Sequence, residues 1–205
     1  MHDDVVDSFH QLYYDTSRLV TAWLGVRIVK CPLDMWVFQD ILYRTRPDLI
    51  IETGTARGGS AYFMACICDL IGNGRILTID VRDAKKRPKH PRITYVQGSS
   101  VDPAILDRVR ASISPGEKVM VTLDSDHAED HVYAELQKYP AFVTKGNYLI
   151  VEDTNVNGHP VYPDHGPGPM EALERFLAET DEFEVDESCE RFLLTLNPSG
   201  FLRRV

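Results

Sequence analysis

The sequence predicts an α/β fold with a doubly wound, mostly parallel sheet and an antiparallel last strand. From residue 48 onward, short apolar runs alternate with segments of helical length, a pattern typical of βαβ units. The apolar runs have no polar face, which indicates strands buried on both sides of a parallel sheet. The last two strands, within residues 182–205, leave no room for a helix between them. We therefore expect them to form a hairpin, with the final strand antiparallel to its neighbours.

Each expected element follows from a local pattern. The strands are predicted at 48–54, 75–81, 92–98, 118–124 and 147–153, and the helices at 59–72, 102–113, 129–139 and 169–179. Asp102 followed by Pro103 is a typical helix start, because the aspartate accepts a free backbone N–H and proline has none to satisfy. The aromatic-rich first 45 residues show no clear strand. They indicate an N-terminal helical extension (1–45), a cap or interface segment, ahead of an α/β domain at 46–205.

Composition restricts the possible function classes. The chain has 205 residues, with 22 Lys and Arg against 31 Asp and Glu, so its formal net charge is −9. This charge disfavours nucleic acid as a partner, since phosphate binding needs a concentrated basic face. The one basic cluster, RDAKKRPKH at 82–90, is interpreted as a solvated turn, or as a patch that steers an anionic ligand. No apolar run could span a bilayer and the acidic start is unlike a signal peptide, so we expect a cytoplasmic protein with no membrane partner. Its four cysteines lack zinc-site spacing and are expected as reduced thiols.

Polar residues follow five successive predicted strands at the point where each ends. In an open α/β sheet, ligands bind beyond the carboxyl ends of the strands, so these residues are expected to share one functional edge. They are Glu52-Thr53-Gly54, Asp80, Gly98-Ser99-Ser100, Asp124-Ser125-Asp126-His127 and Glu152-Asp153.

The glycine-rich turn ETGTARGGS (52–60) points to a cofactor. Its glycine spacing matches neither the G-x-G-x-x-G of nicotinamide binders nor a phosphate loop. Glu52 would repel a pyrophosphate but could hold a cation, and Asp80 can accept both hydroxyls of a ribose. Alone, the turn would be interpreted as structural. Together with Asp80 it fits a positively charged nucleoside without phosphate, which describes S-adenosylmethionine.

Three carboxylates predict a metal site. Asp124, Glu152 and Asp153 follow two strands that are consecutive in the sequence, so they could converge on a hard divalent cation such as Mg²⁺. The alternative is helix capping by Asp124 or Asp126 and simple solvation of the other two.

His127 is the candidate general base for a substrate hydroxyl, because it enters the next helix three residues after Asp124. It could instead cap or pack the helix, or be a metal ligand itself. His131, one turn further on, is expected to be structural.

The long loop within 153–173 contains several Gly and Pro junctions, and loops of this length are uncommon unless they are functional. It can wall a substrate pocket. His159, Tyr162 and His165 are the candidate substrate contacts, although each alone could equally be a packing or solvated loop residue.

Several blocks in the same order resemble the cephalosporin hydroxylase family of class I S-adenosylmethionine-dependent O-methyltransferases, which includes rhamnosyl O-methyltransferases. The blocks are WLGVRIVKCPLDMWVFQDIL, DLIIETGTARGGS, LDSDH, YLIVEDTNVNGHPV and GPGPMEAL, and they run from about Trp23 to Phe176.

This resemblance implies a Rossmann-like sheet of seven strands with an antiparallel last strand, and a methyltransferase domain at 46–205. It implies a Mg²⁺ site of the catechol-methyltransferase kind at Asp124, Glu152 and Asp153, with Asp124 also near the cofactor. In the catechol methyltransferases a lysine lies three residues after the first metal-binding aspartate, where this chain has His127. The identity of the general base therefore remains open. The implied cofactor residues are Glu52, Gly54, Thr55, Gly58, Ser60 and Asp80, with Ser99 or Ser100 near the adenine.

The predicted function is metal-dependent transfer of a methyl group from S-adenosylmethionine to a hydroxyl of a small molecule, a sugar or phenolic group of a natural product. Two alternatives remain: a metal-independent methyltransferase, or a non-catalytic subunit that binds S-adenosylmethionine or substrate for an oxygenase. A nicotinamide-dependent oxidoreductase is disfavoured by the glycine spacing. The aromatic N-terminal segment suggests a subunit contact, so we expect a homo-oligomer.

Overall fold

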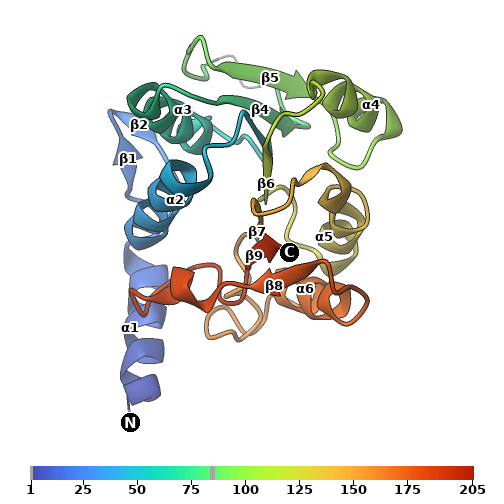
Figure 1. Cartoon of the computed structure of the whole chain (residues 1–205). Helices are drawn as coiled ribbons and strands as arrows, with labels where there is room; N and C mark the ends of the chain where they lie inside the picture. The colour runs from blue at the N-terminus through green and yellow to red at the C-terminus, as the bar shows by residue number, and fades with distance from the viewer. Residues whose placement is uncertain (1, 84–85) are drawn as a thin grey trace.

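The computed structural model describes residues 2–83 and 86–205, so Ala84 and Lys85 of the basic stretch lie outside it. Seven strands form one sheet in the order β5-β4-β3-β6-β7-β9-β8 (Figure 1). Neighbouring strands from β5 to β7 run parallel, which confirms the predicted doubly wound, seven-stranded sheet. These strands are β3 (Leu49–Thr53), β4 (Arg75–Asp80), β5 (Ile93–Gln97), β6 (Val119–Leu123) and β7 (Tyr148–Val151).

The last strand is antiparallel, as predicted. β9 (Phe201–Arg204) lies between β7 and β8 (Phe183–Val185) and pairs antiparallel with both. The connection from β8 to β9 is longer than a hairpin turn and contains the 3-10 helix η2 (Glu187–Glu190). Its length has a physical use, because Cys189, Leu194 and Leu196 within it are buried against the N-terminal half of the chain.

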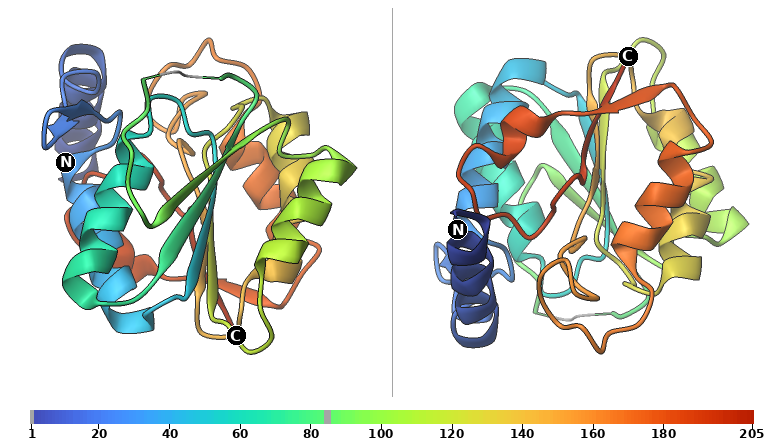
Figure 2. Two further views of the ribbon diagram at one scale, coloured as in Figure 1. Left: turned by 90° about the horizontal axis from the view of Figure 1, so that it is seen from above. Right: turned by 90° about the horizontal axis from the view of Figure 1, so that it is seen from below.

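Helices cover both faces of the sheet (Figure 2). Alternate residues of each buried strand point to opposite faces, so Ile51 belongs to one apolar core and Ile50 to the other. The Ile51 face packs against α4 (Pro103–Ser112), α5 (Glu129–Leu136) and α6 (Pro169–Leu177), and the Ile50 face against α2 (Pro32–Thr45) and α3 (Gly59–Ile71).

The N-terminal segment contains a small hairpin that the sequence pattern did not reveal. β1 (Ala22–Trp23) and β2 (Val26–Arg27) pair around Leu24 and Gly25, which both have positive φ. The expected N-terminal helices are present, but the stretch between them also contains this hairpin, which was missed because strands of two residues carry no readable period. Trp23 packs edge-on against Phe63 of α3, with ring centroids 4.9 Å apart, and so fastens the hairpin to the body of the protein.

α1 (His2–Thr16) extends along the side of the molecule (Figure 1). His10 is buried and hydrogen-bonds to Asn155 at 2.9 Å, which ties the helix to the loop after β7. On the same helix Val5, Phe9 and Leu12 are exposed. The homo-oligomer and the division of the chain at residue 45 stay predictions. None of the helices in the described residues is long and apolar enough to cross a membrane.

Asp34, in the first turn of α2, holds the segment before β9. Its buried carboxylate accepts the backbone N–H of Leu196 at 2.8 Å. Burial raises the pKa of Asp34 to about 7, although hydrogen bonds from Thr195 and Leu196 work in the opposite direction. The folded state therefore holds a proton on this carboxyl that the unfolded chain releases above pH 4.

We expect the stability of the protein to fall as pH rises from about 4 to 7, because only the folded state keeps the Asp34 proton in that window. Asp34→Asn removes this pH-dependent part of the stability while preserving an oxygen acceptor. Urea unfolding of both proteins at pH 5 and pH 8 tests it: the stability of wild type relative to the variant should drop by about 2–4 kcal/mol between the two pH values. An unchanged difference contradicts the expectation.

Candidate active site

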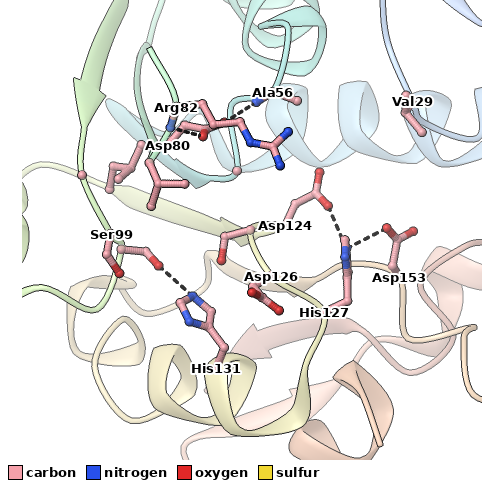
Figure 3. A pocket seen from close by; sticks show the side chains of 16 residues that line it. Val29, Ala56, Asp80, Arg82, Ser99, Asp124, Asp126, His127, His131 and Asp153 are labelled. Carbon is pink, nitrogen blue, oxygen red and sulfur yellow. Dashed lines mark hydrogen bonds and ion pairs between the residues drawn. The ribbon is translucent and has the colours of Figure 1, made fainter. Parts of the chain in front are cut away.

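A cavity of about 410 Å³ opens at the carboxyl edge of the sheet (Figure 3). Residues that follow five of the strands line this cavity. It therefore lies at the edge of the sheet where the sequence predicted the functional residues. They are Gly54 and Ala56 after β3, Asp80, Val81 and Arg82 at the end of β4, Gly98, Ser99 and Ser100 after β5, Asp124, Ser125, Asp126 and His127 after β6, and Asp153 after β7.

The glycine turn after β3 passes directly against the end of β6. Gly54 has φ +86°, and a Cβ at this position would lie 1.6 Å from the backbone oxygen of Asp124. Only glycine permits both this conformation and this approach. Gly58, with φ +78°, precedes the first residue of α3 and lies against Pro88 and Tyr95. The turn is thus shaped to bring backbone close to whatever occupies the cavity.

Glu52 lies beneath the turn and outside the cavity lining. It is fully buried and accepts the hydroxyl of Thr78, while its other oxygen has no hydrogen-bond partner among the described residues. Burial raises the pKa of Glu52, and the hydroxyls of Ser60 and Thr78 partly offset that effect. Thr55 and Ser60 line an adjoining cavity of about 260 Å³. The predicted contact of Glu52 with the cofactor stays a prediction.

Asp80 is held at the cavity rim by backbone donors (Figure 3). Its carboxylate accepts the N–H groups of Ala56 at 2.7 Å and Arg82 at 2.8 Å. Arg87, from the basic stretch, pairs with it at 3.2 Å and is mostly buried, so this residue is not part of a solvated turn. A carboxylate fixed in this way presents a defined acceptor toward the cavity.

Ser99 and Ser100 follow β5 and both line the cavity. The hydroxyl of Ser100 lies 3.1 Å from Nε2 of His131, which also reaches the lining. His131 was expected to be structural. Its ring is paired with Ser100 and with Glu135 of its own helix, at 3.7 Å.

Asp124, His127 and Asp153 come together as a group that could hold a metal ion. His127 Nε2 lies 2.9 Å from Asp153 Oδ2 and 3.4 Å from Asp124 Oδ1 (Figure 3). One ligand atom from each residue lies within 4.8 Å of the others. Nε2 is nevertheless not aligned for a hydrogen bond to either carboxylate. A nitrogen facing two carboxylate oxygens is a donor set that suits a divalent cation.

Glu152 does not join this group, although it is the neighbour of Asp153. Asp153 has φ +56°, and the bend sends the two side chains to different partners. Glu152 is buried, accepts the Thr122 hydroxyl at 2.6 Å and pairs with Lys30. Burial raises the pKa of Glu152, although Lys30 works in the opposite direction. Its predicted role as a metal ligand stays a prediction.

Lys30 is the residue of the site that sequence reasoning missed. It lies between β2 and α2, is buried, and places its Nζ 2.6 Å from Asp124 Oδ2. Burial lowers the pKa of Lys30, but Asp124 and Glu152 raise it by more, so the ammonium stays charged. Its only sequence signal was a lysine inside the apolar run RIVKC.

His127 is also positively charged in this arrangement. Burial lowers its pKa, while the carboxylates of Asp124 and Asp153 raise it to about 11. Despite its own burial, Asp124 has a lowered pKa because Lys30 and His127 both face it. A protonated imidazole can neither accept a proton nor ligate a metal ion, so both roles considered for His127 require that Nε2 first lose this proton.

The three candidate substrate residues of the loop are not equivalent. His165 lines a cavity beside His127 and Asp126. This cavity lies next to the acidic group, the name used below for Asp124, His127 and Asp153. Tyr162 is 52% exposed and packs edge-on against His165, with ring centroids 5.4 Å apart. His159 is paired with Glu171 of α6 at 2.9 Å and lines none of the three cavities described here.

Residues 16–205 match the protein family described as Rhamnosyl O-methyltransferase/CmcI. The chain belongs to this family. It is 40% identical over 216 residues to the rhamnosyl O-methyltransferases of Mycobacterium tuberculosis and Mycobacterium bovis, covering 98% of this chain and 86% of theirs. The Mycobacterium leprae protein of the same name is 37% identical, with 98% and 91% coverage. This member of the family is an S-adenosylmethionine-dependent O-methyltransferase of the rhamnosyl or natural-product type.

Solved structures of other proteins share the fold of this family member. An apo structure of CmcI is 25% identical, with a TM-score of 0.69 over 90% of this chain and 76% of that one. A CmcI structure with Mg and SAM has a TM-score of 0.66 at 23% identity, over 90% and 76% of the two chains. The MycE methyltransferase in complex with Mg, SAH and mycinamycin VI has a TM-score of 0.52 at 21% identity, over 80% and 40%.

Gly54→Ala should damage the site and the fold, because the added Cβ must push Asp124 away. Gly72→Ala is a matched control, since Gly72 also has positive φ (+75°) but a Cβ there meets nothing within 4 Å. We expect the control to lose about 1 kcal/mol and Gly54→Ala more than about 3 kcal/mol in urea unfolding. Equal losses would contradict the close approach of the turn to Asp124.

Proposed function

We propose that this O-methyltransferase transfers the methyl group of S-adenosylmethionine to a hydroxyl of a sugar or phenolic small molecule, assisted by a divalent cation held by Asp124, His127 and Asp153. The observation that carries the proposal is this group of three ligands, at the same cavity as the glycine turn and Asp80. The rhamnosyl O-methyltransferases it resembles support a sugar hydroxyl as acceptor.

In the proposed arrangement the cofactor occupies the cavities on either side of Gly54. Asp80 accepts the ribose hydroxyls with the carboxylate that Ala56 and Arg82 hold in place. Ser99 lies near the adenine. The methionine part extends toward Thr55 and Ser60, which line the adjoining cavity together with Asp124. This order would bring the methyl group near the acidic side chains that are proposed to hold the acceptor hydroxyl. In-line transfer requires that hydroxyl oxygen on the side of the methyl carbon opposite to sulfur.

The acceptor is proposed to enter from the side of His165, where a second cavity reaches His127. A bound divalent cation supplies Lewis acidity, which lowers the pKa of a coordinated hydroxyl toward neutrality. Asp124, His127 and Asp153 hold that cation and fix its position. The loop after β7 is fastened to α1 by the hydrogen bond between His10 and Asn155. The proton of the acceptor hydroxyl would leave to solvent water through the cavity beside His165.

Two roles remain for His127, and they make different demands on Nε2. As a general base it must keep this nitrogen free for a substrate proton. As a metal ligand it uses the lone pair of the same nitrogen. We propose the ligand role, because Nε2 faces both Asp124 and Asp153 at short range without a hydrogen-bond alignment.

Removal of one ligand should weaken metal binding. Asp153→Asn preserves the shape and tolerates the positive φ of this position. By isothermal titration of MgCl₂ we expect roughly tenfold or greater loss of affinity relative to wild type. Asp130→Asn is the control, because it removes an exposed carboxylate from the first turn of α5. Equal effects of the two variants would mean that Asp153 holds no cation.

His127→Asn separates the two histidine roles. The ligand role predicts that Mg²⁺ affinity falls by roughly tenfold or more together with the rate of methyl transfer. The base role predicts unchanged Mg²⁺ affinity and a lower rate. The rate is measured as S-adenosylhomocysteine release with a panel of vicinal diols and catechols.

The second candidate is metal-independent methyl transfer. One observation favours it: the Lys30 ammonium already neutralises Asp124 and pairs with Glu152. Full activity after exhaustive chelation, with no heat of Mg²⁺ binding, would establish this alternative. Loss of activity on chelation and its recovery with added Mg²⁺ support the metal-assisted reaction.

A further inference from the structure

Lys30 reaches the acidic group from a distant part of the chain. It lies in the loop between β2 and α2, while its partners Asp124 and Glu152 are 94 and 122 residues further along. Its side chain is 8% exposed and that of Glu152 only 2%. A buried ammonium loses several kcal/mol of hydration, so it persists only where carboxylates compensate for that loss.

Lys30 shares a carboxylate with the proposed metal ligands. Asp124 directs Oδ2 toward Lys30 Nζ at 2.6 Å and Oδ1 toward His127 Nε2 at 3.4 Å. A cation bound among Asp124, His127 and Asp153 would therefore lie one carboxylate away from the ammonium. Two positive charges this close, in a mostly buried setting, repel each other with little screening.

We propose that Lys30 is a tethered cation that competes with the divalent metal for the acidic group and sets its affinity. This inference rests on the proposed metal-assisted function. Before metal binds, the ammonium compensates Asp124 and Glu152 and so stabilises the site. When metal binds, Lys30 either stays and repels it or withdraws and gives up both ion pairs. Either course weakens metal binding relative to a site without the ammonium.

The competition also links the metal to the cofactor. Residues 27–30 line the cavity that contains Thr55, Ser60 and Asp124, where the methionine part of the cofactor is proposed to lie. A displacement of Lys30 would move a wall of that cavity. Metal occupancy and cofactor binding are therefore expected to influence each other through this loop.

The test is isothermal titration of MgCl₂ into wild type and Lys30→Met, which has a similar length and no charge. We expect Lys30→Met to bind Mg²⁺ roughly tenfold more tightly, because a nearby positive charge is lost. Lys30→Arg retains the charge and should remain near the wild-type affinity. Lys145→Met is the matched control, because it removes the same charge from an exposed position. Lys145 lies in the turn before β7, at the opposite end of that strand from Glu152.

A second pair of variants covers the case in which Lys30→Met does not fold. Lys30→Met combined with Glu152→Gln removes one charge of each sign and keeps the buried site balanced. Its Mg²⁺ affinity is compared with that of Glu152→Gln alone, and the double variant should bind more tightly. Thermal unfolding and S-adenosylhomocysteine titration establish that each variant is folded.

The outcomes separate the inference from the proposed function. Equal or weaker Mg²⁺ binding by folded Lys30→Met, with clear binding by wild type, overturns the competition and leaves the metal-assisted function standing. No Mg²⁺ binding by wild type or by any Lys30 variant overturns the metal-assisted function itself. Binding by Lys30→Met where wild type shows none supports the competition directly.

Discussion

The whole site depends on the parallel pairing of β3 with β6 at the centre of the sheet. The two strands stay in register to their last residues, where Thr53 pairs with Leu123 and its carbonyl accepts the N–H of Asp124. Because both strands end together, the glycine turn and the acidic group begin at the same place. Gly54 then removes the one side chain that would hold them apart. The glycine turn and the acidic group therefore lie side by side because of this one strand pairing.

The buried charges at this edge follow a common rule. Three carboxylates are compensated by neighbouring groups: Asp80 by backbone N–H groups and Arg87, Asp124 by Lys30 and His127, and Glu152 by Lys30 and Thr122. In a medium of low polarity an unpaired charge would be far more costly than the pair. A change to one partner therefore transfers its energetic cost to the others.

Much of the fold could be predicted from local patterns. The five parallel strands lie within the predicted ranges, because apolar runs between helical segments are a strong signal. The number of strands in the sheet followed from the family resemblance, whereas the strand order was not predicted. The β1–β2 hairpin was missed, since two-residue strands leave no pattern.

The site was less predictable for reasons of distance and direction. Polar residues at strand ends located the cavity, because a parallel sheet brings them to one edge. The separation of Glu152 from Asp153 depends on a single backbone angle that no residue pattern reveals. Lys30 could not be assigned to the site from the sequence, because its partners are carboxylates 94 and 122 residues away.

The long separation between Lys30 and its partners also bears on how the chain is made. Lys30 leaves the ribosome 94 residues before Asp124 and 122 residues before Glu152, so the ammonium has neither carboxylate during most of synthesis. The first helices can form early from local contacts, whereas the neutralised acidic edge requires the chain as far as Glu152. The ion pairs of the active edge can therefore form only after synthesis has passed β7.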